Sequence, residues 1–282
     1  MEYATLKDSK LRVSRVGFGC CPMGGHDWGS VSVSELENAV SVALDNGVNF
    51  FDTADIYGLG ESERRLGRFL KGRRRLAIIA TKGGVRRDSS GRTYYDISPA
   101  WIETAIEESL YRLGTDYIDL YQVHYLDGVI PVEKILDILE KERVKGKILY
   151  YGLSNITAAD LEGVDLPKHA ITFQLQYSLA HRENEKVVSE LQKKYGLAFM
   201  SWGSLGQGVL TGKYNEDSVF PGNDRRCRQV YVNFYGEKLR KNLRIIETLR
   251  AIAIHRRKTP AQVAISWILD YLSGAVALVG IK

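Results

Sequence analysis

Cysteine and proline are both scarce in this chain of 282 residues. The sequence has three cysteines, Cys20, Cys21 and Cys227, and six prolines. So odd and sparse a set of cysteines does not build a disulfide framework, and none of the three has the spacing of a metal site. We therefore expect a protein of a reducing compartment, without a disulfide core and without a bound metal.

Long hydrophobic runs and a strong excess of one charge are also missing. The longest nearly apolar stretch, residues 272–281, has about ten residues and is too short to cross a bilayer. The N-terminus, MEYATLKDSK, is polar and has no signal-peptide core. Lysine and arginine total 39 against 34 acidic residues, and the basic runs at 71–75 and 225–228 read as solvated loops. We expect a cytoplasmic protein that binds neither membranes nor nucleic acids, because nucleic-acid binding needs a larger, clustered excess of positive charge.

The composition is otherwise that of a folded globular chain. Hydrophobic residues make up 44% and charged residues 26% of the sequence. These fractions exclude a disordered or collagen-like protein. The length suits either two domains or one α/β barrel of ~250 residues. Because no linker or low-complexity stretch divides the chain, we expect one domain over residues 1–282.

Short β-branched runs alternate with helical patterns along the whole chain. Strands are expected at 16–19, 49–52, 76–80, 117–121, 147–152, 171–175, 197–202 and 275–279. Helices are expected between Ser32 and Gly47, at 61–72, between Ser98 and Gly114, at 132–145, from Ala158, and at 183–195, 238–256 and 260–272. A long loop is expected from 203 to about 235.

Eight strands that alternate with helices indicate a parallel sheet with right-handed crossovers. Closed on itself, such a sheet is the (β/α)8 TIM barrel. The rival architecture is an open, doubly wound sheet, which usually carries a glycine-rich phosphate turn after its first strand. Here the first turn, GFGCCPMGG at 17–25, lacks the GxGxxG spacing and leads into no immediate helix. The sequence therefore favours the barrel.

Polar side chains stand at the ends of the expected strands, where barrel enzymes carry their chemistry. Asp52 ends the second strand, Lys82 the third and His124 the fourth, and Tyr57 follows in the loop after Asp52. Successive strand ends lie about one βα unit apart, so these side chains are expected to meet on one rim. His26, in the loop after the first strand, is interpreted as a surface residue.

This set of side chains suits the reduction of a carbonyl group. Tyrosine has a pKa of about 10 in water, and the Lys82 ammonium is expected to lower the pKa of Tyr57. Asp52 neutralises the lysine, and His124 donates a hydrogen bond to a substrate oxygen. The carbonyl oxygen of the substrate becomes negative as hydride arrives, and it then faces Tyr57 as an acid and His124 as a hydrogen-bond donor. The hydride itself must come from a cofactor, because no side chain carries one.

Further candidates follow the later strands. Three residues have side chains suited to binding a carboxamide: Ser154, Asn155 and Gln174. Trp202, at the end of the seventh expected strand, can stack on a flat ring. Simpler roles remain open: Asp52 and Lys82 as a structural ion pair, His124 as a core residue, Asn155 as a helix cap and Trp202 as packing. The functional interpretation depends on their shared position at the strand ends.

Several segments together resemble the aldo-keto reductase family. They are GVNFFDTADIYG at 47–58 with ESE at 61–63, ATK at 80–82, SLYRLGTDYIDLYQVH at 109–124, GLSN at 152–155, QLQY at 174–177, SWGSLGQGVLTGK at 201–213 and FPGNDR at 220–225. The resemblance runs from about residue 6 to the end of the chain. The FPGNDR segment is similar to the bacterial and plant branch of inositol-dehydrogenase-like and auxin-induced-like reductases.

The resemblance implies a TIM barrel with a short N-terminal β-hairpin. It implies that NADPH, with NADH possible, lies extended across the rim, and that a tetrad of Asp52, Tyr57, Lys82 and His124 acts with Tyr57 as the proton donor. Ser154, Asn155 and Gln174 are then expected to hold the carboxamide, and Trp202 to stack on the nicotinamide. The other residues implied to contact the cofactor are Cys20, Cys21, Asp52, Gly203, Leu205, Gln207, Gly208, Lys213 and Lys282.

The sequence ends at ALVGIK, residues 277–282. In the family a following segment grips the adenosine phosphate, and a last helix and tail cover the barrel. We therefore expect a single barrel domain over 1–282 that lacks this helix and tail, with Lys282 as the candidate for the phosphate.

The expected activity is the NADPH-dependent reduction of a small aldehyde or ketone to an alcohol, or its reverse. One alternative is a Schiff-base aldolase with Lys82 as its nucleophile. Another is a redox-sensing regulatory subunit that holds NADP and turns over slowly, as the family's potassium-channel β subunits do. The sequence names neither substrate nor oligomeric state: sugars, polyols and aromatic aldehydes remain open, with Trp28, Tyr94, Tyr125 and Tyr231 as candidates to line the pocket.

Overall fold

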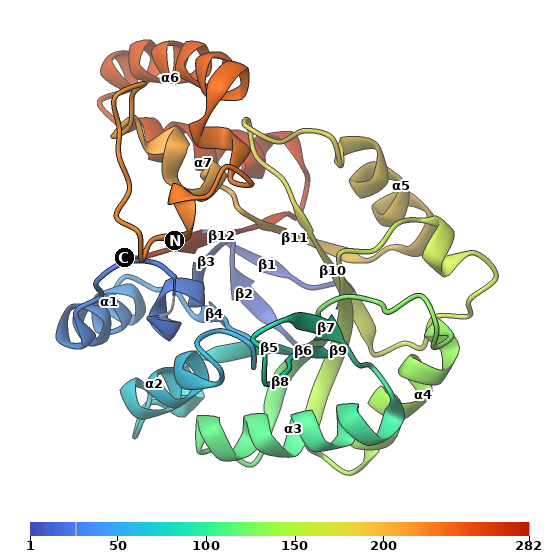
Figure 1. Cartoon of the computed structure of the whole chain (residues 1–282). Coiled ribbons are helices and arrows are strands. Elements are labelled where there is room, and N and C mark those ends of the chain that lie inside the picture. Colours follow the sequence, from blue (N-terminus) through green and yellow to red (C-terminus); the bar gives the residue numbers. More distant parts are fainter. Residues whose placement is uncertain (26, 282) are drawn as a thin grey trace.

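The computed structural model describes residues 1–25 and 27–281, so that the interpretations of His26 and Lys282 fall outside the described residues. Eight parallel strands close into a barrel, in the order β10-β11-β12-β3-β4-β5-β8-β9 (Figure 1). The predicted TIM barrel is therefore confirmed, and the open sheet is not formed.

All eight expected strands are present. They are β3 (Val16–Gly19), β4 (Phe50–Asp52), β5 (Ile78–Gly83), β8 (Ile118–Val123), β9 (Ile148–Ser154), β10 (Ala170–Gln176), β11 (Ala198–Trp202) and β12 (Val276–Gly280). The third strand starts two residues later than expected and runs on to Gly83. Lys82 therefore lies within β5, paired in register with Gln122 of β8.

Seven helices surround the barrel within the described part of the chain (Figure 1). They are α1 (Val33–Asp45), α2 (Glu61–Phe69), α3 (Pro99–Leu113), α4 (Val132–Val144), α5 (Glu185–Tyr195), α6 (Gly236–Arg256) and α7 (Pro260–Tyr271). The predicted caps hold: the Ser32 and Ser98 hydroxyls accept hydrogen bonds from backbone N–H groups of the first turns of α1 and α3. Gly114 ends α3 with a φ of +62°.

The helix expected from Ala158 was a wrong prediction. β9 and β10 are joined instead by a single 3-10 turn, η3 (Ala159–Leu161), in which only Leu161 is buried. One buried apolar residue does not make the apolar stripe that holds a helix on a barrel. The Asp160 carboxylate also accepts hydrogen bonds from the backbone N–H and the hydroxyl of Thr157, and so stabilises the turn by itself.

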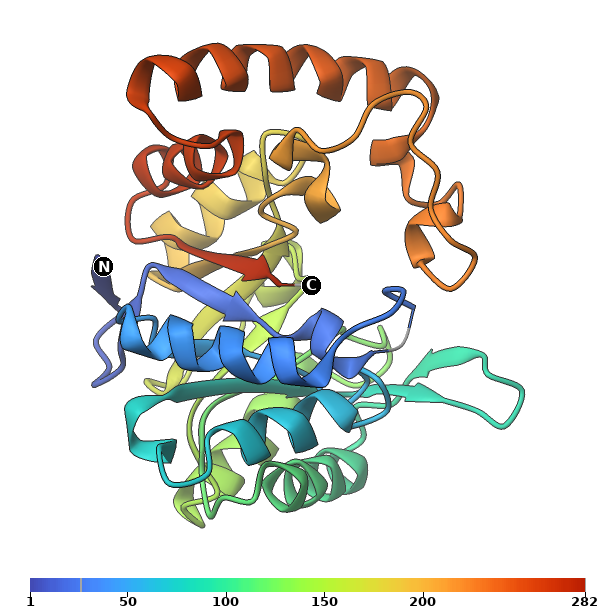
Figure 2. The ribbon, with the colours of Figure 1, turned by 90° about the vertical axis from the view of Figure 1, so that its left-hand side faces the viewer.

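Two β-hairpins lie outside the barrel, near its opposite ends (Figure 2). β1 (Tyr3–Thr5) and β2 (Arg12–Ser14) form the N-terminal hairpin that the family resemblance implied. Its turn residues Leu6 and Leu11 are buried in the same cluster as the inward-facing side chains of the barrel strands. The second hairpin, β6 (Val85–Arg87) and β7 (Thr93–Tyr95), was not predicted, and it projects from the end where the strands point.

The chain between β11 and α6 covers the same end of the barrel. It contains three short 3-10 helices, η4 (Gly206–Thr211), η5 (Arg225–Cys227) and η6 (Val232–Phe234). Val209, Leu210 and Phe234 are buried in a cluster with Leu239 and Ile246 of α6, so this long loop has its own apolar anchor. No helix within 1–25 and 27–281 is long and apolar enough to cross a membrane.

Candidate active site

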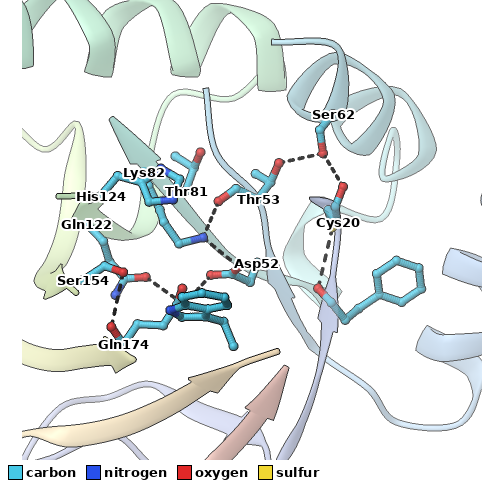
Figure 3. A network of polar contacts seen from close by, with 12 residues as sticks. Cys20, Asp52, Thr53, Ser62, Thr81, Lys82, Gln122, His124, Ser154 and Gln174 are labelled. Atoms are coloured by element: carbon cyan, nitrogen blue, oxygen red, sulfur yellow. Dashed lines mark hydrogen bonds and ion pairs between the residues drawn. The ribbon is translucent and has the colours of Figure 1, made fainter. Parts of the chain in front are cut away.

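A buried ion pair stands where β4 and β5 end. The Lys82 ammonium is fully buried, and it donates hydrogen bonds to Asp52 Oδ1 at 2.7 Å and to the Thr53 carbonyl oxygen at 2.8 Å (Figure 3). Asp52 is 4% exposed. A buried charge is tolerated where a partner of opposite sign and further hydrogen bonds replace water. Asp52 is available as the partner of Lys82 because Asp52 of β4 pairs in register with Ala80 of β5, which brings the ends of these two strands together.

Tyr57 lies beside this ion pair. Lys82 Nζ is 5.2 Å from the centroid of the Tyr57 ring, and the ring meets His124 edge-on at a centroid distance of 5.8 Å. The loop that carries Tyr57 lies against the turn at Gly24. A Cβ on Gly58, where φ is +62°, would fall 2.3 Å from the Gly24 carbonyl oxygen. Two glycines are thus required for the backbone approach that positions Tyr57.

Burial raises the pKa of Tyr57 well above its ordinary value, and the Cys21 thiol and the Asp52 carboxylate act in the same direction. The prediction that the pKa of Tyr57 lies below its ordinary value was wrong, because burial outweighs the effect of the neighbouring charge. The lysine directs its hydrogen bonds to Asp52 and Thr53 and not to the phenol. The phenol of Tyr57 therefore stays protonated at neutral pH.

His124 follows β8 and is 9% exposed. Burial lowers the pKa of its imidazole well below the usual value, and the Lys82 ammonium lowers it further. The ring stacks on Tyr125 at 5.3 Å, and Tyr125 stacks in turn on Tyr95 of the second hairpin at 5.0 Å. Its Nδ1 has no hydrogen-bond partner among the described residues. The imidazole is therefore neutral at neutral pH and is positioned mainly by neighbouring rings.

Ser154, Asn155 and Gln174 come together, but their donors are directed at one another and at the barrel. Gln174 Nε2 donates to Asp52 Oδ2 at 2.9 Å, and the Ser154 hydroxyl donates to the Gln174 carbonyl oxygen at 3.3 Å (Figure 3). Asn155 Nδ2 donates to the His124 carbonyl oxygen and to Ser154 Oγ. Because the amide nitrogens of Asn155 and Gln174 are used in these bonds, their side-chain oxygens are the atoms that can accept hydrogen bonds from a carboxamide.

The predicted cofactor residues that follow β11 form a tight turn. Gly203, Gly206 and Gly208 have φ of +66°, +56° and +104°, and Gln207 between them has a φ of +55°. Trp202 precedes this turn, and its indole Nε1 donates to Asn155 Oδ1 at 3.1 Å. Four residues with positive φ thus occur within six positions, and the three glycines among them have no side chain to keep a ligand away from the backbone.

The remaining predicted residues are spread around this end of the barrel. The Gln207 side chain accepts a hydrogen bond from Asn233 Nδ2, and Leu205 packs on the apolar cluster of the long loop. Lys213 is exposed, and Cys21 is half-buried. Cys20 is fully buried, its thiol donating to the Phe18 carbonyl oxygen at 3.7 Å.

Two residues of the site were missed by the sequence reasoning. Gln122 is fully buried, and its Nε2 has no partner among the described residues. Strand alternation could have found it, because Gln122 shares the face of β8 that His124 continues. The other is Tyr95, which stacks on Tyr125, whereas the predicted Tyr94 lies over the guanidinium of Arg86. The error follows from the missed hairpin, in which neighbouring residues point to opposite faces.

The comparison with known proteins covers almost the whole chain. The sequence profile of the Aldo/keto reductase family matches residues 15–282. Aldo-keto reductase YhdN of Bacillus subtilis is 33% identical over 285 residues, which cover 100% of this chain and 85% of that protein. Aldo-keto reductase yakc [NADP(+)] of Schizosaccharomyces pombe is 34% identical over 289 residues, covering 100% of this chain and 84% of that protein.

Solved structures agree with these matches. The glycerol dehydrogenase AKR11B4 from Gluconobacter oxydans superposes with a TM-score of 0.87 at 31% sequence identity, over 99% of this chain and 86% of that chain. Within the described residues, no group of three or more His, Cys, Asp or Glu side chains is arranged to hold a metal ion.

Proposed function

This chain belongs to the aldo/keto reductase family, and from that premise we propose that it is an NADPH-dependent oxidoreductase that reduces an aldehyde or ketone to an alcohol. The observation that carries the proposal is the contact between a protonated phenol, a neutral imidazole and a buried ammonium–carboxylate pair at one end of the barrel. These are the groups that a carbonyl oxygen needs as negative charge develops on it.

The residues present fit a nicotinamide dinucleotide. The side-chain oxygens of Asn155 and Gln174 are placed to accept hydrogen bonds from a carboxamide, and Gln122 Nε2 is a buried donor without a partner among the described residues. We propose that Ser154, with these amides, orients the nicotinamide, and that Trp202 stacks on it. The NADP(+) in the name of the yeast relative supports the same cofactor.

The turn after β11 is the proposed site of the pyrophosphate. Its glycines and the backbone of Gln207 allow a close approach of the diphosphate. We propose further contacts with the cofactor from Cys20, Cys21, Leu205 and Lys213. When bound, NADPH supplies the hydride to the carbonyl carbon and becomes NADP+.

Tyr57 is the proposed proton donor to the carbonyl oxygen, and His124 the proposed hydrogen-bond donor beside it. Because burial holds the pKa of Tyr57 high, the phenol carries its proton until the oxygen becomes basic. The phenolate left behind lies next to the Lys82 ammonium, which stabilises it. Asp52 holds that ammonium in place.

The same geometry favours the reductase over a Schiff-base aldolase. An aldolase lysine must be a free amine when it attacks, whereas Lys82 donates hydrogen bonds at 2.7 and 2.8 Å to a carboxylate and a carbonyl oxygen. Among the described residues, Asp52 is the base that contacts Lys82 and could remove its proton, and it is itself hydrogen-bonded to Gln174.

The first experiment is a titration of the protein with NADPH and with NADH, followed by tryptophan fluorescence. We expect quenching at micromolar NADPH, and a Trp202→Phe variant should lose most of that quenching. Oxidation of NADPH over many turnovers with a panel of aldehydes then separates a reductase from a slow regulatory subunit. Absence of both quenching and turnover would refute the proposal.

A further inference from the structure

Arg225 is brought to the mouth of the barrel by a contact between two loops. Trp28, in the loop after β3, forms an antiparallel bridge with Asp224 in the long loop. The Arg225 N–H donates to the Asp27 carbonyl oxygen at 2.8 Å, and the Gly29 N–H to the Asn223 carbonyl oxygen at 3.1 Å. The long loop descends on the same side as the β6–β7 hairpin, beyond the ends of the barrel strands (Figure 2). Arg225 therefore belongs to the end of the barrel that carries Tyr57.

The guanidinium of Arg225 retains hydrogen-bonding capacity. Its Nε is buried and has no hydrogen-bond partner among the described residues. Its Nη2 lies 3.6 Å from Asp27 Oδ2, which is beyond ordinary hydrogen-bond length, and the group lies 5.3 Å from the centre of the Trp28 ring. A buried donor without an acceptor is unfavourable unless a ligand supplies one.

The side chain of the neighbouring Arg226, in contrast, is hydrogen-bonded within the long loop. It donates to both oxygens of Asp224 at 2.9 and 2.7 Å and to the Tyr214 hydroxyl at 2.6 Å. Its side chain is 7% exposed. Arg226 thus holds the long loop together, and the expectation that residues 225–228 form a solvated loop was wrong for Arg226.

The charges of this cluster do not balance. Asp224 is paired with Arg226, whereas Asp27 is shared by Arg225 at 3.6 Å and Arg228 at 3.1 Å. Three arginines against two aspartates leave one positive charge. At the catalytic groups, Lys82 and Asp52 compensate one another. An anion is therefore favoured at Arg225 rather than at the ion pair below it.

Arg225 is connected to the catalytic groups on two sides. On one side lies Cys21: burial raises the pKa of its thiol, Arg225 opposes that shift, and Cys21 in turn contributes to the raised pKa of Tyr57. On the other side lies Tyr231, whose hydroxyl accepts a hydrogen bond from the Arg225 side chain: burial raises the pKa of this phenol, and Arg225 again opposes the shift. Tyr231 also raises the pKa of Tyr125, whose ring stacks on His124. Arg225 therefore lies among the side chains that surround Tyr57 and His124.

We propose that Arg225 determines substrate specificity by binding a carboxylate at the far end of the carbonyl substrate, so that the preferred substrates are aldehydes or ketones that carry an acid group. The planar guanidinium fork matches the two oxygens of a carboxylate. This inference rests on the proposed reductase function. The carboxylate takes no part in the bond changes: the carbonyl carbon receives hydride from NADPH, its oxygen receives the proton of Tyr57, and NADP+ leaves.

The test compares two substrates with the same reacting aldehyde, the anion 4-formylbenzoate and its uncharged methyl ester. In the wild-type protein we expect kcat/KM to favour the acid by ~10-fold or more, through a lower KM. Arg225→Met should bring the ratio of the two kcat/KM values close to one, and Arg225→Lys should restore part of it. Arg240→Met is the matched control, because it removes an exposed arginine of α6 outside this cluster and should leave the ratio unchanged.

The outcomes separate this inference from the proposed function. If the wild-type protein reduces the ester and Arg225→Met leaves the ratio unaltered, the inference is overturned and the reductase function stands. A ratio that stays unchanged while the NADPH Kd rises in Arg225→Met would assign the arginine to the cofactor, which also overturns it. If the wild-type protein reduces neither probe, this inference is overturned, and the proposed function falls with it only if NADPH quenching and turnover of the aldehyde panel are also absent.

Discussion

Gln174 Nε2 donates a hydrogen bond to Asp52 Oδ2 at 2.9 Å, and this bond crosses the interior of the barrel from β10 to β4. In the closed order of eight strands these two are four places apart, so they face one another. Lys82 occupies the other oxygen of the same carboxylate. A residue that the sequence suggested only for the cofactor therefore also orients the Asp52–Lys82 ion pair, and a change at Gln174 is expected to disturb both that pair and the proposed cofactor site.

Tyr57→Phe tests the proton donor. The variant keeps the ring beside Lys82 and removes the hydroxyl, so kcat should fall by about 10²–10⁴ while NADPH binding is retained. The measurements are steady-state reduction and fluorescence titration. Tyr111→Phe, on the exposed face of α3, is the control and should behave as wild type. Reduction by Tyr57→Phe at the wild-type rate would exclude Tyr57 as the acid.

The Asp52–Lys82 pair should show strong energetic coupling. Lys82→Met leaves the buried Asp52 carboxylate with Gln174 alone, and removing one member of a buried pair costs about 3–5 kcal/mol in the free energy of unfolding. Lys82→Met combined with Asp52→Asn should be less destabilised than the sum of the two single variants. Urea unfolding of the four proteins measures this coupling.

A matched control for that cycle is the exposed pair of Lys241 and Glu237 on α6. Lys241→Met should leave the urea midpoint almost unchanged, because solvent screens exposed charges. Additive effects of the two substitutions at Asp52 and Lys82 would mean that the ion pair does not hold either residue in the folded protein.

His124 should make the protein less stable in mild acid. Burial holds the pKa of its imidazole below the usual value of about 6.5, so the unfolded chain takes up a proton there that the folded protein does not. The free energy of unfolding should fall as the pH drops below about 6.5, by up to about 1.4 kcal/mol per pH unit from this residue. His124→Phe should remove that part of the slope.

The control for this pH dependence is His255, which is exposed on α6. His255→Gln should keep the wild-type slope between pH 5 and pH 7.5 when unfolding is followed in urea. An identical slope for wild type and His124→Phe would show that the imidazole is accessible to protons in the folded state.

Arg226→Gln should loosen the long loop. The substitution removes the two bonds to Asp224 and the bond to Tyr214, all within a side chain that is 7% exposed. Since a loop opens more often as its local stability falls, thermolysin should cut between residues 213 and 235 at least ~10-fold faster than in wild type. Arg228→Gln, whose side chain is 55% exposed, should resist thermolysin as wild type does. Equal cleavage of the two variants would contradict this role of Arg226.

Predictions from the sequence were good where the signal is local. The cap at Ser32 and the stop at Gly114 depend on side chains within one helical turn, and both are found in the structure. The helix expected from Ala158 failed because a cap pattern starts a helix only where an apolar stripe follows it. The second hairpin was missed for a related reason, because two strands of three residues are too short for their alternation to stand out.

The residues proposed to be catalytic show the same division. Their positions at strand ends could be predicted from the sequence, because alternation and spacing depend only on neighbours along the chain. The direction of the pKa shift of Tyr57 could not be predicted, because the neighbours of its phenol come from other loops. The direction of the shift depends on burial and on the fact that Lys82 faces Asp52.

The order of residues therefore determined the strands, the helices and the side chains available at one rim of the barrel, since these follow from periodicity and from local caps. Tertiary structure alone decided how those side chains are used. Gln174 meets Asp52 across 122 positions of sequence, and Arg228 meets Asp27 across 201. No local pattern encodes such contacts, because they form only when the barrel closes and the long loop folds back over its mouth.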